Sequence, residues 1–332
     1  MAQTVAHATL GLTQPANIEH PKITLAAKEI DPVEWKGDIL AVGVTEKDMT
    51  KDENSKFQNS VLKKLDGLLG GLLADVLSEE DFTGKAGQST VLRLPGLCSK
   101  RIGLIGLIGL GHSASSPAAF RGRGEAVAAA AKAAQANSVA VVLASAEGLS
   151  NESKLSTASS IASGTVLGIH EDNRYMSELK KPQLKSVDIF GLGTGPELEK
   201  KLKYAEDVSS AIIFGRELAN SPANVLTPAA LVAEASKIAS LYNDVLSANI
   251  LTADQCKELK MGSYLGVAAA SANPPYFIHL CYKPSSRPIK ANGGYNIKTG
   301  PGCLIEMMKT DMGGSAAVLG AAKALGKSNL LE

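Results

Sequence analysis

The sequence lacks the features that mark membrane-spanning and nucleic-acid-binding proteins. Aromatic residues make up only 4% of the 332 residues, too few for an extended base-stacking surface. The net charge is +1, so no excess of basic residues favours binding to a polyanion. No apolar run approaches the roughly 20 residues that cross a bilayer. We therefore expect no nucleic-acid partner and no membrane partner.

Cysteine is also scarce, and its spacing excludes a disulfide framework. The chain has 4 cysteines and no C-x-x-C pair: Cys98, Cys256, Cys281 and Cys303. This pattern is typical of the reduced thiols of an intracellular protein. The first residues, MAQTVAHATLGLTQPANIEHPK, lack the basic start and apolar stretch of a secretory signal. We expect a cytoplasmic location, with a plastid location as the alternative because a transit peptide is compatible with this composition.

Several common catalytic and binding motifs are missing. The 5 histidines show no H-E-x-x-H spacing, and there is no G-x-S-x-G nucleophile turn. His279 lies in an apolar stretch, Tyr276–Cys281, which favours a strand histidine over a metal ligand. Gly191-Leu192-Gly193-Thr194-Gly195 follows a predicted strand, as a phosphate-binding turn does. Its third glycine has the wrong spacing for a dinucleotide site, so an ordinary tight turn is favoured.

What is present is the pattern of an α/β protein. The chain is 45% hydrophobic and 20% charged, which is typical of a globular protein with a substantial core. Strands are predicted at Lys22–Ile30, Gly37–Thr45, Arg101–Leu110 and Ser138–Ala144. Apolar residues at helical spacing predict helices at Ser55–Leu77 and Ala119–Gln135. Strands that alternate with helices favour a mostly parallel sheet.

A change in pattern predicts two domains. A strand near Val187 runs into the glycine-rich turn, and Pro196 then begins a charged helix, Pro196–Leu218. We interpret this helix as a link, with an α/β domain at residues 1–195 and a second α/β domain at residues 196–332. Another helix is predicted at Ala229–Tyr242.

Two residues near the C-terminal end are candidates for chemistry. Lys298 follows Gly293-Gly294 in KANGGYNIK, and Asp311 lies in MMKTDMGGSAAVLGAAKA. A lysine near a carboxylate can stabilise an oxyanion, although a lone lysine is far more often a solvated surface residue. Asp311 is equally suited to capping the small-residue helix that follows it. The residues alone leave both alternatives open.

These segments, with ELANSPANVLTP, resemble the leucine aminopeptidase family (the M17 peptidases), especially its plant-type members. The resemblance covers nearly the whole chain. It implies an N-terminal α/β domain, a linking helix and a metallopeptidase domain. It also implies hydrolysis of N-terminal residues, preferentially Leu, from peptides, with two divalent metal ions (Mn, Zn or Mg) in a homo-hexamer. It places the catalytic lysine on Lys298 and a metal-binding aspartate on Asp311.

The sequence departs from the family pattern where other ligands are expected. Before the Gly-Gly pair the family reads roughly VGKGLTFDSGG, whereas Ala291 stands at the aspartate position here and Ser286 at the lysine position. The NTDAEGR motif, which supplies another Asp, a Glu and an Arg in the family, is not found before Glu332. We therefore expect incomplete metal binding, impaired activity and a poorly packed second domain that does not support the hexamer.

Two alternatives to a working peptidase remain open. The chain is compatible with a non-catalytic binding protein or oligomer partner that acts through its N-terminal domain. It is also compatible with a truncated splice or gene-model product.

Overall fold

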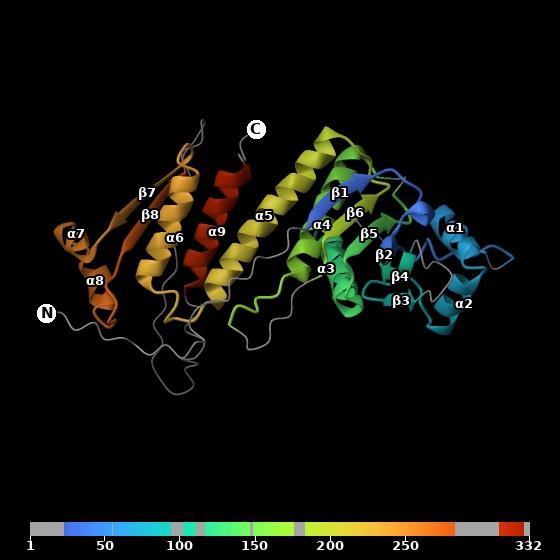
Figure 1. Cartoon of the computed structure of the whole chain (residues 1–332), viewed down its shortest axis with the longest axis horizontal. Helices are drawn as coiled ribbons and strands as arrows, with labels where there is room; N and C mark the ends of the chain where they lie inside the picture. The colour runs from blue at the N-terminus through green and yellow to red at the C-terminus, as the bar shows by residue number, and fades with distance from the viewer. Residues whose placement is uncertain are drawn as a thin grey trace. The chain divides into compact units, whose positions relative to one another are not determined.

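The structure is a computed structural model that describes residues 23–54, 56–93, 102–110, 117–146, 149–175, 183–282 and 312–328. The chain forms two compact units (Figure 1). The N-terminal unit comprises Glu19–Glu171 and Lys180–Ser209. Among the described residues, the C-terminal unit comprises 172–175, 210–282 and 312–328.

The N-terminal unit is built on a six-stranded sheet with the order β1-β6-β5-β2-β4-β3. The strands are β1 (Thr24–Lys28), β2 (Gly37–Val44), β3 (Ser89–Arg93), β4 (Ile102–Gly109), β5 (Ser138–Leu143) and β6 (Ser186–Phe190). Every neighbouring pair is parallel except β3–β4, which is antiparallel. This confirms the predicted α/β class with a mostly parallel sheet.

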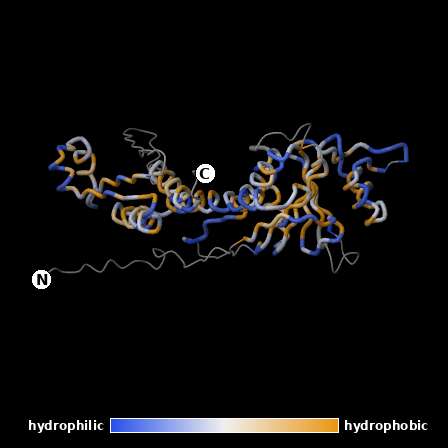
Figure 2. Tube along the Cα trace, turned by 90° about the horizontal axis from the view of Figure 1, so that it is seen from above, coloured by the Kyte–Doolittle hydropathy of each residue, from blue (hydrophilic) through white to orange (hydrophobic). Residues whose placement is uncertain are grey.

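Helices cover both faces of this sheet. They are η1 (Pro32–Glu34), α1 (Ser60–Leu68), α2 (Leu72–Glu79), α3 (Pro117–Ala134), α4 (Asn151–Ile169) and the first part of α5 (Pro196–Asn220). Alternate residues of β2 point to opposite faces: Ile39 packs in the cluster with α3, α4 and α5, and Leu40 in the cluster with α1 and α2. Figure 2 shows these strands as mostly hydrophobic, as expected for strands buried on both faces.

The predicted single helix at Ser55–Leu77 is wrong: the chain forms α1 and α2 there. Gly70 and Gly71 separate them, with φ of 65° and 94°. Left-handed backbone at two successive residues ends the helix, and glycine adopts it without a steric penalty. The apolar spacing continues across the break because both helices bury leucines against the same face, which is why periodicity alone did not reveal it.

The C-terminal unit has a smaller core. Its described residues form two antiparallel strands, β7 (Leu246–Leu251) and β8 (Phe277–Tyr282). The helices of this unit are α6 (Pro228–Leu241), α7 (Ala253–Glu258), α8 (Gly262–Ala268), α9 (Gly313–Ser328) and the second part of α5. The core is formed by Leu218, Ala235, Ile238, Leu246, Tyr282, Ala316, Leu319 and Ala322. This unit contains the candidate site.

Helix α5 contributes to both units. Leu198, Leu202 and Ala205 belong to the core of the N-terminal unit, whereas Leu218 belongs to the core of the C-terminal unit. The predicted domain limit between residues 195 and 196 lies at the first residue of α5. That residues 1–195 fold independently remains a prediction.

The ELANSPAN motif, which begins at Glu217 near the end of α5, holds the segment around Arg174. The guanidinium of Arg174 donates two hydrogen bonds to the Asp172 carboxylate, at 2.7 and 2.8 Å, and one to the Glu217 carbonyl at 2.5 Å. Ser221 Oγ donates to the same carbonyl at 2.7 Å. Part of the ELANSPAN motif therefore has a structural role, since it anchors residues 172–175 within the C-terminal unit.

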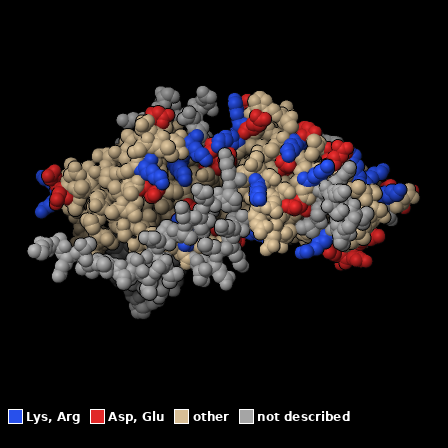
Figure 3. Space-filling model, in the orientation of Figure 1, with Lys and Arg blue, Asp and Glu red and all other residues tan. Residues whose placement is uncertain are grey.

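The surface of the described residues agrees with the near-zero net charge. Lys and Arg side chains are interspersed with Asp and Glu side chains on the face shown in Figure 3. In the described ranges, no helix has the length and hydropathy required to cross a membrane.

Candidate functional site

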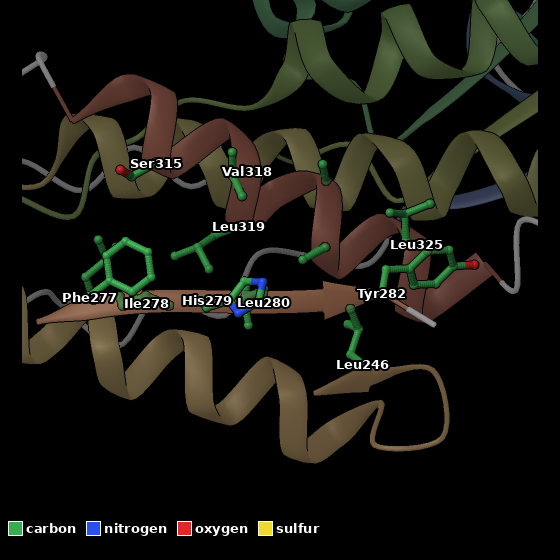
Figure 4. Close-up of a pocket in the computed structure, with 13 residues that line it drawn as sticks. Leu246, Phe277, Ile278, His279, Leu280, Tyr282, Ser315, Val318, Leu319 and Leu325 are labelled. Atoms are coloured by element: carbon green, nitrogen blue, oxygen red, sulfur yellow. The ribbon is translucent and has the colours of Figure 1, made fainter. Parts of the chain in front are cut away.

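A pocket of about 340 Å³ lies between β8 and α9 in the C-terminal unit (Figure 4). Phe277, Leu280 and Tyr282 line it from β8, and Val318 and Leu319 line it from α9. The strand supplies both faces of its pleat, because consecutive residues from Phe277 to Tyr282 except Cys281 contribute to the lining. The pocket is suited to an apolar group.

Its polar groups are few. The described lining includes the His279 imidazole and the Ser315 hydroxyl, and none of the described lining residues is acidic. His279 lies on β8, as expected, with Nε2 at 3.4 Å from the Sγ of Cys281. An imidazole without a neighbouring carboxylate offers one nitrogen ligand and cannot neutralise a pair of divalent cations.

A second pocket, of about 330 Å³, lies where α9 begins. Met312, Tyr276, Tyr264 and Thr227 are among its lining residues. The Tyr264 hydroxyl donates a hydrogen bond to the Tyr276 carbonyl at 2.7 Å. Burial raises the pKa of Tyr264, so this phenol stays protonated at neutral pH and acts as a hydrogen-bond donor.

The two predicted site residues, Lys298 and Asp311, lie outside the described residues, as do the altered positions Ser286 and Ala291. The described chain resumes at Met312, directly before α9. The roles predicted for Lys298 and Asp311 therefore stay predictions.

The described part of the chain does not fit a two-metal centre on its own. Within it, no group of three or more His, Cys, Asp or Glu side chains is close enough to hold a metal ion. Two divalent cations need several carboxylate ligands.

Small residues in the motif that follows Asp311 have a packing role. A Cβ on Gly320 of α9 would lie 3.0 Å from the Ala211 carbonyl oxygen of α5, and one on Gly215 would lie 3.3 Å from the Ala316 carbonyl oxygen. The two helices thus approach closely through glycine and alanine. This close approach explains why SAAVLGA is rich in small residues, a signal that helix periodicity did not reveal.

The glycine-rich turn after β6 is occupied by a side chain of the same chain. Gly193 has a φ of 90°, and its N–H donates a hydrogen bond to Glu29 Oε1 at 2.9 Å. A carboxylate thus takes the place in which a phosphate-binding turn would hold a phosphate oxygen. This supports the interpretation of the turn as an ordinary connection to α5.

Comparison with known protein families places both halves of the chain in one family. Residues 41–179 match the N-terminal domain of the cytosol aminopeptidase family, and residues 213–331 match the catalytic domain of the same family. The two matches lie in the order that the sequence predicted.

Curated plant proteins are similar over nearly the whole chain. Leucine aminopeptidase 2, chloroplastic, of Arabidopsis thaliana is 72% identical, with 98% of this chain and 58% of the relative covered. Neutral leucine aminopeptidase, chloroplastic, of Solanum lycopersicum is 66% identical, with 98% of this chain and 59% of the relative covered. The chain thus spans a little over half the length of these relatives.

Solved structures agree with the fold. A tomato leucine aminopeptidase mutant has a TM-score of 0.86 and 57% identity, over 96% of this chain and 62% of that one. The bottromycin maturation enzyme BotP, solved in complex with Mn, has a TM-score of 0.63 and 24% identity, over 89% of this chain and 57% of that one. The second likeness concerns the fold alone. Together with the two domain matches and the plant relatives, these findings show that the chain belongs to the cytosol aminopeptidase (M17) family.

Proposed function

We propose that this chain derives from a leucyl aminopeptidase, a hydrolase that removes N-terminal residues from peptides, but does not itself carry out the reaction. The observation that carries the proposal is the segment between β8, which ends at Tyr282, and Gly293-Gly294. Where the family pattern has a lysine and a metal-binding aspartate before the glycines, this chain has Ser286 and Ala291. Losing a carboxylate ligand weakens the binding of a divalent cation pair.

The alignment with the Arabidopsis relative supports an internal loss. It extends over 339 positions, more than the 332 residues of this chain, so it includes positions at which this chain has no residue. A missing apolar strand before Gly293 is consistent with such a gap.

The residues that remain have defined roles in the proposal. Asp311 is the metal ligand that the chain retains, and Lys298 is the cation that would stabilise the negative charge on the scissile carbonyl oxygen. Mn, Zn and Mg are the candidate metals. In a complete site such ions activate a water molecule for attack on the peptide.

A leucyl-anilide assay with added Mn²⁺, Mg²⁺ or Zn²⁺ tests the proposal. We expect no metal-dependent turnover by the purified chain, and none after Asp311→Ala. Turnover that requires metal and is lost in both Asp311→Ala and Lys298→Ala would show that the chain is an active peptidase. A full-length relative assayed in parallel controls for the substrate and the metals.

A second candidate function is that of a non-catalytic oligomer partner. The N-terminal unit favours it, because its sheet is covered on both faces and its core is extensive although the metal-binding segment is altered. Coexpression with the full-length Arabidopsis relative, followed by affinity capture and light scattering, tests this. If the chain is an oligomer partner, mixed hexamers with the relative are expected, and capture of the tagged chain alone would argue against this function.

We further propose a plastid location. Several of the similar plant proteins are chloroplastic, which favours the plastid alternative over the cytoplasmic location expected from the sequence. A C-terminal fluorescent fusion of the chain, imaged with a plastid marker, would decide between the two compartments.

A further inference from the structure

The most unusual charged group in the N-terminal unit is Arg123 on α3. Its residue exposure is 6%, and neither terminal nitrogen of its guanidinium has a hydrogen-bond partner within the structure described here. Two buried terminal nitrogens without a partner are energetically costly, since their four N–H donors lose water and gain no hydrogen bond. Such a group calls for a physical explanation.

The guanidinium is still held in a defined orientation. Its central carbon lies 4.1 Å from the centroid of the Phe120 ring, one turn earlier on α3. Stacking on an aromatic ring covers one flat face of the guanidinium and leaves the N–H groups at its edge free to bind. Burial lowers the pKa of Arg123 to about 10, so the group remains charged at neutral pH.

Arg123 lies in the second turn of α3, whose amino end follows the carboxyl end of β4. Helix α3 follows β4, and Phe120 packs in one cluster with Ile108 and Leu143, near the carboxyl ends of β4 and β5. The neighbouring strands β2 and β5 lead to helices on opposite faces of the sheet: β2 leads to α1 and α2, and β5 leads to α4. A parallel sheet binds ligands at such a switch point.

A second buried donor lies at the same end of the helix pair. Thr157 Oγ1 on α4 has no hydrogen-bond partner within the described ranges, and the residue is 1% exposed. Helices α3 and α4 run parallel, because Gly164 meets the Arg121 carbonyl and Gly168, one turn later, meets Glu125 and Ala128. Thr157 is one turn before Ile161 and therefore lies in the amino-terminal part of α4.

We propose that this end of α3 binds a small oxyanion, specifically a phosphate group, through the guanidinium of Arg123, with the hydroxyl of Thr157 as a further donor. The planar fork of arginine matches the geometry of phosphate oxygens. The amino end of an 18-residue helix adds a favourable dipole. The site belongs to the N-terminal unit and is separate from the peptidase residues.

The test is a phosphate titration of the full chain, followed by thermal unfolding. Trp35, the only tryptophan, is 4% exposed and lies in the same unit, so its fluorescence reports the relevant transition. We expect a saturable rise in melting temperature with inorganic phosphate that exceeds the rise in chloride of equal ionic strength. Absence of a saturable rise would overturn the proposal.

Two variants separate specific binding from the general stabilising effect of phosphate. Arg123→Met should lose the saturable response. Arg121→Gln removes the same charge from the same helix at an exposed position and should keep it. Equal responses of the wild type and Arg123→Met would overturn the proposal.

A third variant and a second anion complete the design. If Arg123→Met does not fold, Arg123→Lys can replace it, because lysine keeps the charge but lacks the planar guanidinium. The phosphate concentration at half-saturation should then rise at least tenfold. An unchanged half-saturation concentration would overturn the proposal. Acetate at matched concentrations tests the anion class. A saturable response to acetate with none to phosphate would contradict the assignment of a phosphate group.

Discussion

At the residue scale, the pair of Asp172 and Arg174 connects the short segment 172–175 to the end of α5. The two side chains are 6% and 16% exposed, so water screens their interaction little. Burial raises the pKa of Asp172, but the hydrogen bonds and charge of Arg174 outweigh it and hold that pKa below its usual value. The pair is therefore an interaction that one substitution should disrupt strongly.

We expect Arg174→Met to lower the unfolding free energy of the C-terminal unit by about 3 kcal/mol, because it leaves a buried carboxylate without its partner. Urea unfolding monitored by circular dichroism measures this. The exposed pair of Lys200 and Glu197 provides a control, since Lys200→Met should change stability by less than about 1 kcal/mol. Equal effects of the two substitutions would contradict the expectation.

The same pair predicts a pH dependence. Because the pKa of Asp172 is lowered by folding, its contribution to stability is present above the unfolded-state pKa, about 3.9, and is lost as pH falls through the folded-state pKa. Unfolding free energies measured from neutral pH into this acidic range should fall less steeply for Asp172→Asn than for the wild type. Parallel curves would exclude a role for Asp172 in acid unfolding.

At the scale of elements, α3 and α4 pack so closely that side chains are excluded from the contact. A Cβ on Gly164 would lie 2.1 Å from the Arg121 carbonyl oxygen, and one on Gly124 would lie 2.2 Å from the Ile161 carbonyl oxygen. The neighbours are backbone atoms, so neither helix can relieve the overlap by changing a rotamer. The two glycines thus set the distance between the helices.

Gly164→Ala should therefore destabilise the N-terminal unit by about 3 kcal/mol or more through overpacking. Gly122→Ala on α3 is the matched control, because its Cβ would have no atom within 4 Å. It should stabilise by about 0.5–1 kcal/mol, since alanine is the better helix former. Thermal unfolding followed by Trp35 fluorescence compares the stabilities of the two variants. An unchanged stability of Gly164→Ala would show that the helices can separate at little cost.

The sequence predicted most elements of the N-terminal sheet but not their arrangement. Strands β1, β2, β4 and β5 coincide with predicted runs of apolar residues, as do helices α3, α5, α6 and α9. Periodicity is local, so it could not reveal that β2 lies between β4 and β5. It also left α4 unpredicted, because this helix is buried through small residues and has little amphipathic contrast.

The candidate site could be predicted only in part. A lone lysine and a lone aspartate carry no local signal of catalysis, so Lys298 and Asp311 were identified through the family resemblance. Arg123 was not singled out, because an arginine in an alanine-rich helix is ordinary in sequence. Its burial depends on how α3 packs against the sheet and against α4.

At the scale of the whole molecule, the division of α5 between two cores determines where the chain can be cut. A fragment that ends at Gly195 lacks Leu198, Leu202 and Ala205, which are 2%, 4% and 1% exposed. We expect the fragment 1–195 to be less stable than the fragment 1–209 by several kcal/mol, since burying one leucine contributes about 1.5–3 kcal/mol. Urea unfolding of both fragments, followed by Trp35, tests this; equal midpoints would support the limit at residue 195.

The C-terminal unit should bind the dye ANS under native conditions. It combines a pocket of about 340 Å³ with exposed Leu241, Leu259 and Val267, at 66%, 61% and 45%. Exposed apolar surface of this kind binds ANS and favours aggregation. The fragment 1–209 serves as the control and should bind little dye. A monodisperse hexamer of the full chain without ANS binding would show that this unit is better packed than we expect.

The sequence by itself determined the family, the α/β class and the positions of most strands and helices, because motifs and periodicities are properties of neighbouring residues. Only the tertiary structure decided the break at Gly70–Gly71, the sharing of α5 between two cores and the isolation of Arg123. The physical reason is that close packing and desolvation arise between residues far apart in the chain, and that the leucines on both sides of Gly70–Gly71 keep one apolar spacing because they pack against the same face. Their energies depend on which surfaces meet, and no local pattern records that.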